Sequence, residues 1–237
     1  MAKICKIDAR RLYDEPVDLS IHGYSFVEML RAESKKRTRP KRERTSFLLL
    51  ASTAELLCED LPDQLTVERV VTQAGSARGT FYSHFQDVHE IMTTVLVLFV
   101  NIIWRQRPPR LIRPTPKELL TSGLVFYCRI FELNASLLRA SDIVVDKSSE
   151  LSRNRQKVHN NLIDITTQAY LKRFPGKLAT TDQSDLRKLL MLLTCSLDEA
   201  LRRRFCRQDP IYLEVFPTST ELAHGMSKLW VQTLFKT

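Results

Sequence analysis

The 237-residue sequence contains few of the residues that make tight turns, cross-links or membrane spans. Glycine occurs only six times, and apolar residues recur at helical rather than alternating spacing, which favours an all-α fold. The five cysteines are scattered and include no Cys-x-x-Cys pair, so we expect reduced thiols in a cytoplasmic protein and no metal site. The most apolar stretch, 95–104, is too short to cross a bilayer. No apolar core of a signal peptide follows Met1.

Positive charge is concentrated in one short segment. The formal net charge is +9, and residues 35–44 contain seven basic residues and one acidic residue. A localised basic block indicates a polyanionic partner, either nucleic acid or an anionic membrane, although a solvated tail has the same composition. A membrane role would need an adjoining amphipathic helix, for which residues 25–34 are a weak candidate, so nucleic acid is favoured.

We predict that this segment is a basic arm that stays mobile until it binds DNA, because it has nothing to bury and Pro40 interrupts a helix. An arm in front of a DNA-reading domain can lie along phosphates or in a minor groove. The expected contacts are Lys35, Lys36, Arg37, Arg39, Lys41 and Arg42.

The apolar pattern divides the chain into three parts. Residues 1–43 form an N-terminal extension, in which 25–33 are either a short helix or disordered. Residues 44–89 form a small helical domain, and residues 90–237 form a larger helical body. Helices are expected from about Ser46 to Asp60, then at 66–74, 78–85, 87–106, 116–133, 135–146, 148–174, 183–207 and 218–235.

Two short helices separated by a glycine turn make up residues 66–85. Thr66 stands at an N-cap position, and Gly75 suits a turn that needs a positive φ. On the second helix Phe81 and Phe85 lie four residues apart, so both can pack inward. Small and polar residues then project outward, where a DNA major groove would lie: Gly79, Thr80, Tyr82 and Ser83.

The stretch Ala-Gly-Ser-Ala-Arg-Gly-Thr-Phe-Tyr-Ser-His-Phe at 74–85 closely resembles the helix-turn-helix of the tetracycline-repressor (TetR) family. Leu65-Thr66-Val67 and Glu90-Ile91 also stand where that family has a capping threonine and the start of its fourth helix. The resemblance implies a nine-helix homodimer whose first three helices bind DNA, whose middle helices enclose a ligand pocket and whose last two helices pair between subunits. The DNA-binding residues expected from the motif and its surroundings are Arg44, Thr66, Arg78, Gly79, Thr80, Tyr82, Ser83 and His84.

The sequence departs from the family pattern at three places. The usual serine cap of the recognition helix is Ala77, a common lysine at the start of the fourth helix is Val88, and Asp60-Leu61-Pro62 replaces a glycine after the first helix. These departures concern individual contacts and leave the motif in place.

Apolar residues of the larger body suggest a subunit interface and a pocket. The helix at 183–207 is apolar on most sides and needs more cover than the last helix offers, so a second subunit is expected, with an intramolecular core as the alternative. Expected interface residues are Leu189, Leu193, Leu197, Leu222, Met226 and Trp230. Candidates for lining a pocket, or for an ordinary core, are Phe99, Phe126, Tyr127, Phe131, Ile163, Thr167 and Tyr170. Their low charge favours a lipophilic effector.

The sequence therefore predicts a non-enzymatic, cytoplasmic regulator of transcription, acting as a repressor, that binds a palindromic double-stranded operator as a homodimer. A small-molecule effector of unknown identity would release it, and no cofactor or membrane partner is expected. One alternative is a dimeric DNA-binding protein without a ligand. Another is a helical enzyme with a basic tail, which would need a nucleophile–base pair or metal cluster that the sequence does not suggest.

Overall fold

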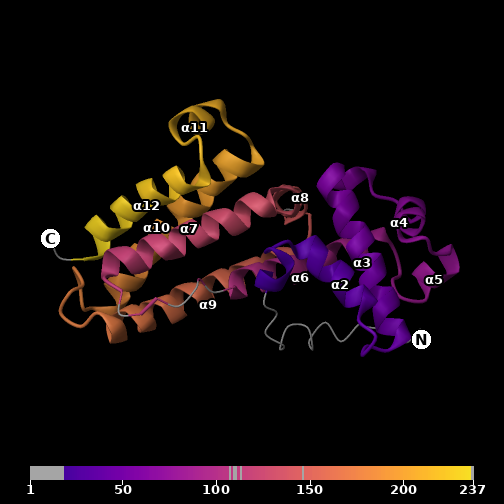
Figure 1. Ribbon diagram of the computed structural model, residues 1–237, viewed down its shortest axis with the longest axis horizontal. Helices are drawn as coiled ribbons and strands as arrows, with labels where there is room; N and C mark the ends of the chain where they lie inside the picture. Colours follow the sequence, from indigo (N-terminus) through magenta and orange to yellow (C-terminus); the bar gives the residue numbers. More distant parts are fainter. Residues whose placement is uncertain (1–18, 107, 109–110, 113, 146, 236–237) are drawn as a thin grey trace. The chain divides into compact units, whose positions relative to one another are not determined.

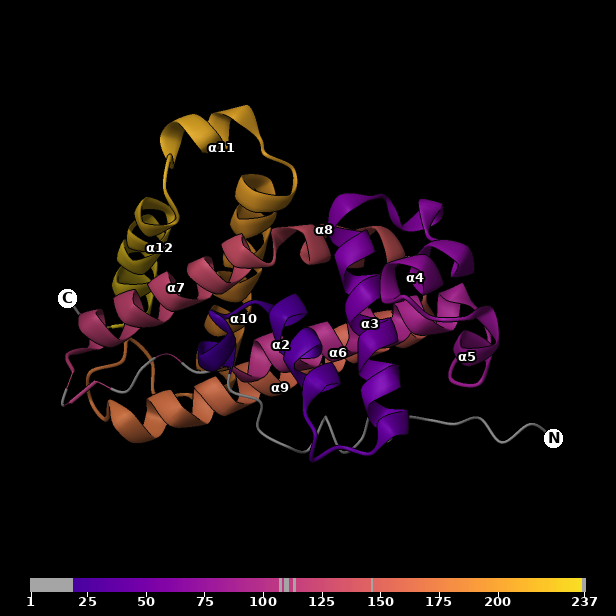
Figure 2. The same ribbon diagram turned by 45° about the vertical axis from the view of Figure 1, so that its right-hand side comes forward.

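The computed structural model describes residues 19–106, 108, 111–112, 114–145 and 147–235. The predicted all-α fold is confirmed: in these ranges the only strand-like feature is an isolated bridge between Leu178 and Phe235. The chain forms two compact units, which are described separately (Figures 1 and 2). The first unit comprises Met1–Gln106 and Ser136–Arg155, and the second comprises Arg107–Ala135 and Gln156–Thr237.

The first unit is organised around α3, which contacts α2, α4 and α6. Buried leucine, alanine and phenylalanine side chains lie on several sides of α3, so it can serve as the core of three packing interfaces. The elements in chain order are η1 (Leu19–His22), α2 (Phe26–Lys35), α3 (Lys41–Glu59), η2 (Pro62–Gln64), α4 (Val67–Ala74), α5 (Arg78–Tyr82) and α6 (Val88–Arg105).

The N-terminal extension contributes a packed helix to this unit. Ser25 caps α2 by accepting a hydrogen bond from the Glu28 N–H, and the rings of Phe26 and Phe99 pack edge to face with their centroids 5.3 Å apart. Before α2, the Leu19 N–H donates to the side-chain oxygen of Gln106 at 3.0 Å. Of the two interpretations left open for residues 25–33, the helical one is therefore correct.

The compact units do not follow the boundaries at 44 and 90 that the apolar pattern suggested. Residue 44 lies inside α3, and α6 packs against α3 within the first unit. Among the described helices, α6 alone is long and apolar enough to suit a membrane span, and 61% of it is buried inside the protein. The core helix of a soluble protein has the same composition. The apolar residues of α6 therefore pack in the core of the first unit.

Two helices connect the units, and the second unit contains the rest of the body. Helix α8 (Ala135–Val145) lies almost entirely in the first unit, and α9 (Ser149–Arg173) runs from the first into the second. The second unit also contains α7 (Pro116–Leu133), α10 (Gln183–Leu201), the π-helical turn η3 (Arg202–Cys206), α11 (Pro210–Val215) and α12 (Ser219–Leu234). Helix α12 packs against α7 and α10, as Figures 1 and 2 both show for α7.

Local capping explains where the helices of the second unit begin. Thr115 and Thr218 each form a reciprocal capping box with the glutamate three residues later, Glu118 and Glu221. Helix α11 was missing from the sequence prediction, which had Asp209-Pro210 only as a break. Asp209 instead caps α11, and proline is favourable at the first helical position.

Candidate nucleic-acid interface

The turn between α4 and α5 has the conformation that its sequence requires. The Thr66 hydroxyl accepts a hydrogen bond from the Arg69 N–H at 3.3 Å and so caps α4. Gly75 ends α4 in the left-handed region at φ 57°, where a side chain would add strain. The Ser76 N–H then returns to the Val71 carbonyl at 2.8 Å. These bonds fix the direction in which the chain enters α5.

Helix α5 is anchored by two phenylalanines. Phe81 is completely buried and Phe85 is 5% exposed, and their rings lie 5.9 Å apart, so their predicted inward packing is confirmed. Tyr82 is 52% exposed, and Gly79 and Ser83 are also exposed. The helix therefore keeps its large apolar groups inside and presents a polar surface, although DNA contact by that surface remains a prediction.

The helix is shorter than expected, ending at Tyr82 instead of Phe85. Ser83 is its C-cap, and the Ser83 hydroxyl donates to the Thr80 carbonyl at 2.7 Å. The N–H groups of His84 and Phe85 both turn back to the Phe81 carbonyl. Competition of this kind between serine side chains and the helical bonding pattern is what ends a helix early. Ala77 precedes the helix without a side-chain cap, as its methyl group dictates.

Arg78 lies at the start of α5 with its guanidinium held by local partners. Its Nη1 atom is 2.9 Å from a Glu68 carboxylate oxygen, and both side chains are largely exposed. A hydrogen bond with Tyr82 and then the charge of Glu68 raise the pKa of Arg78. Because exposed ion pairs contribute little to stability, a phosphate can replace Glu68 at small cost.

His84 is tied to the first helix of the unit. Its Nδ1 atom lies 2.7 Å from the Ser46 hydroxyl, which is also 3.2 Å from the Arg42 carbonyl. Partial burial and the nearby Arg42 charge lower the pKa of His84, so the neutral imidazole is favoured. One ring nitrogen is therefore occupied within the protein. Ser46 could not be predicted as a partner of His84, because a contact across 38 residues leaves no local signal in the sequence.

The basic segment is not the mobile arm that its composition suggested. Pro40 occupies the N-cap position of α3 and so begins a helix instead of interrupting one. Arg39 contacts the carboxylate of Glu33, lies 3.2 Å from Glu43 and stands over the ring of Phe47 at 5.0 Å. The two acidic residues, one on each flanking helix, explain why this cation is held in place.

The remaining basic residues of 35–44 differ in their exposure and in their contacts with other side chains. Lys36 lies 3.4 Å from Glu33, and Arg44 is half-buried with its Nε atom lacking a hydrogen-bond partner. Four others are exposed and form no ion pair with the described carboxylates: Lys35, Arg37, Lys41 and Arg42.

The candidates for a ligand pocket lie within the two cores. Phe99 belongs to the first unit, and the other six belong to the second. Phe99, Phe126, Phe131, Ile163 and Thr167 are buried, and Tyr127 and Tyr170 are half-buried. Burial raises the pKa of Tyr170, which therefore stays neutral. Pocket lining by these residues stays a prediction.

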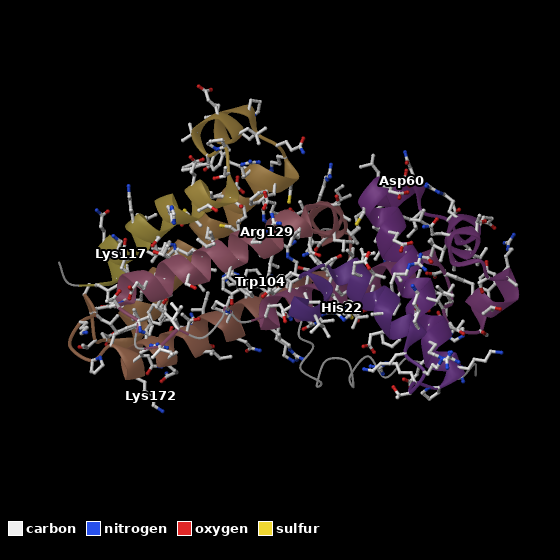
Figure 3. All side chains as sticks on the ribbon, in the orientation of Figure 1. His22, Asp60, Trp104, Lys117, Arg129 and Lys172 are labelled. Carbon is white, nitrogen blue, oxygen red and sulfur yellow. The ribbon has the colours of Figure 1, made fainter. Side chains whose placement is uncertain are left out.

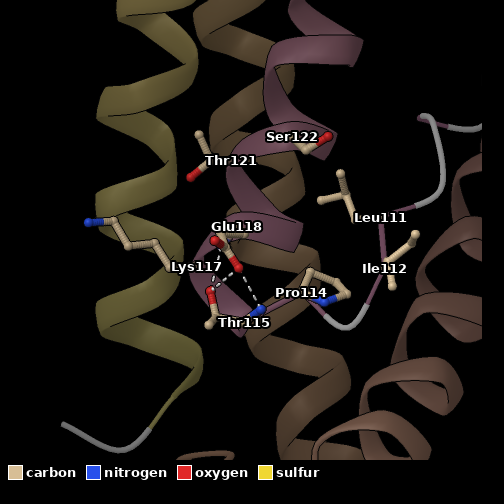
Figure 4. A pocket seen from close by; sticks show the side chains of 8 residues that line it. All are labelled: Leu111, Ile112, Pro114, Thr115, Lys117, Glu118, Thr121 and Ser122. Carbon is tan, nitrogen blue, oxygen red and sulfur yellow. Dashed lines mark hydrogen bonds between the residues drawn. The ribbon is translucent and has the colours of Figure 1, made fainter.

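A separate hollow of about 710 Å³ opens at the start of α7 (Figure 4). Leu111, Ile112 and Pro114 line one side, and Thr115, Lys117, Glu118, Thr121 and Ser122 line the other. None of the seven candidates lines this hollow. Its wall includes the Thr115–Glu118 capping box, whose hydrogen bonds appear in Figure 4.

The predicted interface residues are mostly covered by their own unit. Leu193, Leu197, Leu222 and Trp230 are each less than 9% exposed, and Leu189 and Met226 are half-buried. The first four can offer little surface to another subunit, because α7, α10 and α12 already pack together. Leu192 on α10 and Leu229 on α12 are 69% and 45% exposed instead. The sequence pattern missed this distinction because both α10 and α12 are apolar on several sides.

Within the described residues, no cluster of three or more histidine, cysteine or acidic side chains is arranged to hold a metal ion. The described cysteines form no disulfide with one another, and burial raises the pKa of the Cys128 thiol to about 12.

Comparison with known proteins gives matches in structure alone. No family model and no curated protein matches the chain. A protein from Mesorhizobium loti described as a TetR-family transcriptional regulator matches with a TM-score of 0.62 and 15% identity, over 84% of this chain and 100% of that one. A protein from Pseudomonas aeruginosa described as a transcriptional regulator matches with a TM-score of 0.59 and 14% identity, over 84% of this chain and 94% of that one. SmeT, the repressor of the multidrug efflux pump SmeDEF of Stenotrophomonas maltophilia, matches with a TM-score of 0.60 and 16% identity, over 85% and 93%.

Proposed function

We propose that this chain, which has the fold of TetR-family transcriptional regulators, is a transcriptional regulator that reads a palindromic DNA operator through α5. The observation that carries the proposal is the division of α5 into a buried aromatic side and an exposed polar side. A major groove about 12 Å wide admits an α-helix. Phe81 and Phe85 hold the helix from behind, so its outer residues can meet base edges.

The residues around α5 divide into base-reading and phosphate-binding candidates. We propose Arg78 and Thr80 as the base-reading residues, and exposed Gly79 would permit close approach of the backbone. Tyr82 and Ser83 can donate hydroxyl hydrogen bonds. The remaining candidates are phosphate contacts: Thr66 at the start of α4, Arg44 on α3 and the outer edge of His84.

A homodimer would place two copies of α5 on successive half-sites. Leu192 on α10 and Leu229 on α12 are exposed, which favours contact between these helices and a second subunit. We propose repression as the direction of regulation, which the repressor role of the structural neighbour SmeT supports. The apolar aromatic residues of α7 and α9 favour a lipophilic effector that binds the free and DNA-bound states with different affinity.

The first experiment selects genomic fragments that bind the purified protein and then titrates the best duplex with a Tyr82→Ala variant. We expect binding at least tenfold weaker with the melting temperature nearly unchanged, because Tyr82 is exposed. The matched control is Ile21→Ala, which changes a 77% exposed residue of the same unit. Equal affinity of the Tyr82→Ala variant and the parent would remove Tyr82 from the interface, and failure of the parent to select any genomic fragment would overturn the proposed function.

The effector is tested separately by thermal shift against a metabolite library, followed by titration of the protein–operator complex with each stabilising compound. A compound that raises the melting temperature and releases the operator supports a ligand-gated regulator. Stabilisation without release would favour the alternative in which the body only dimerises.

A further inference from the structure

We propose that residues 35–42, which comprise the turn between α2 and α3 and the adjoining ends of both helices, are a preformed surface for the DNA backbone beside the bases read by α5. This inference rests on the proposed function and extends it to a second contact. Figure 2 shows α2 and α3 side by side and joined by this turn, which we call the basic corner. Its partner is the phosphate ladder, irrespective of base sequence.

The cations of the basic corner have two different roles. Arg39 is partly buried among Glu33, Glu43 and the Phe47 ring, so its charge is already neutralised. Lys35, Arg37, Lys41 and Arg42 are exposed, and no ion pair joins them to the described carboxylates. Arg39 therefore stabilises the turn, and the four exposed cations remain available to bind a polyanion.

Helix α2 holds the corner in a fixed position relative to the helix-turn-helix. Phe26, Met29 and Leu30 are at most 1% exposed against the rest of the unit. The Glu55 carboxylate on α3 joins Arg31 of α2 to Gln73 of α4, the latter at 2.8 Å. Burial alone would raise the pKa of Glu55, but hydrogen bonds from Arg31 and Gln73 lower it, so the carboxylate stays charged.

The basic corner is also continuous with the end of α5. Arg42 lies one helical turn before Ser46, whose hydroxyl is 2.7 Å from His84 Nδ1. The charge of Arg42 is near enough to lower the pKa of His84. A duplex against the outer side of α5 therefore passes close to the start of α3. Because these cations are held before binding, little chain entropy is lost when phosphates reach them.

The chemistry of the corner favours phosphate over a membrane surface. Residues 35–42 contain no apolar side chain except Pro40, and insertion into a bilayer boundary would require a hydrophobic face. Lysine and arginine on a rigid turn suit a regular row of phosphates. The corner therefore contributes affinity and salt dependence but no base preference.

The test uses the 237-residue chain with Lys35, Arg37, Lys41 and Arg42 all changed to glutamine. The probe is a mixed-sequence duplex of about 30 base pairs, titrated at several salt concentrations. Each lost phosphate contact should reduce the slope of log K against log salt by about 0.9, so the expected reduction is about 3 to 4 with at least tenfold weaker binding. The melting temperature should change little because the four side chains are exposed.

The matched control removes the same charge from the second unit, with Lys117, Lys172, Lys177 and Lys228 changed to glutamine. All four are exposed, and Figure 3 shows Lys117 and Lys172 on the surface. This control should retain the parental slope. An Arg39→Gln variant should instead lower the melting temperature, because it leaves Glu33 without its main partner.

The outcomes separate this inference from the proposed function. A parental slope in the corner variant, while Tyr82→Ala still weakens operator binding, overturns the corner and leaves the α5 interface standing. Equal slope losses in the corner and control variants overturn it too, because net charge alone would then explain the effect. Preference of the parent for vesicles containing phosphatidylserine over the duplex overturns it in favour of a membrane. A parent that binds no duplex at low salt overturns both proposals.

Discussion

Each compact unit exposes a helix surface that its own core does not cover, and the two surfaces differ in chemistry. On α5 the apolar rings of Phe81 and Phe85 point inward and the outer side is polar. On α10 and α12 the exposed residues include Leu192 and Leu229. The difference indicates different partners, because a polar surface flanked by cations suits a polyanion and exposed leucines suit another apolar surface.

The largest expected effect tests whether the buried side of α5 is essential to the first unit. A Phe81→Ala substitution should destabilise it by about 3–5 kcal/mol, since the ring is fully buried and its removal leaves a cavity. Urea unfolding measures this loss, and DNA binding should disappear with it. Tyr82→Ala is the control from the other side of the helix. If both variants unfold at the same urea concentration, α5 does not have two distinct sides.

The next prediction concerns the apolar surface of the second unit. Leu192→Glu should raise the dissociation constant of the dimer at least 100-fold, about 2.7 kcal/mol, because pairing would bury a charge. Sedimentation velocity over a range of concentrations measures it. Ile165→Glu on α9 is the control, at 58% exposure in the same unit. Dissociation caused by the control and not by Leu192→Glu would place the interface on α9.

The sequence predicted those features that depend on neighbouring residues. The spacing of Phe81 and Phe85, the Thr66 cap and the Gly75 turn each act within a few residues, and the structure has them all. The bounds of α7 at Pro116–Leu133 agreed with the prediction for the same reason, because Thr115 and Pro116 mark its start.

Features that depend on distant contacts were not predicted. Arg39 looked like a mobile cation in the sequence, but Glu33 and Phe47 reach it only after α2 folds along α3. Similarly, the exposure of Leu192 and the burial of Leu193 depend on how α7 and α12 pack, which the periodicity of α10 cannot reveal. Helical spacing identifies apolar residues but does not identify the residues that cover them.

A pair of glycine variants sharpens the contrast between the fold of the first unit and its outer surface. Gly75→Ala should cost about 1–2 kcal/mol, because Gly75 has φ 57°. Gly79→Ala should leave stability equal or slightly higher, since a methyl group there meets nothing within 4 Å and alanine favours helix. Thermal unfolding and operator titration together separate the two roles. Gly79→Ala should weaken operator binding if the α5 backbone approaches the bases, and unchanged affinity would exclude that approach.

The smallest expected effect is a proton linkage confined to the DNA-binding surface. Burial and Arg42 lower the pKa of His84 in the free protein, whereas a DNA phosphate at its outer edge would raise it. Binding would then take up a proton. Affinity should rise by up to about tenfold as pH falls through the pKa of the complex, and it should level off below the pKa of the free protein.

Stability should change with pH in the opposite sense. The pKa of His84 is lower in the folded protein than in the unfolded chain, so folding favours the neutral imidazole. The contribution of His84 to the free energy of unfolding is therefore fully present above the pKa of the unfolded chain. It is lost as pH falls through the lower pKa of the folded protein. His84→Asn keeps a donor or acceptor near Ser46 and removes the titration, so it should flatten both profiles below about pH 7. Dimerisation through exposed Leu192 and Leu229 should not change with pH over the same range. If DNA affinity still rises steeply at low pH in the His84→Asn variant, a group other than His84 takes up the proton on binding.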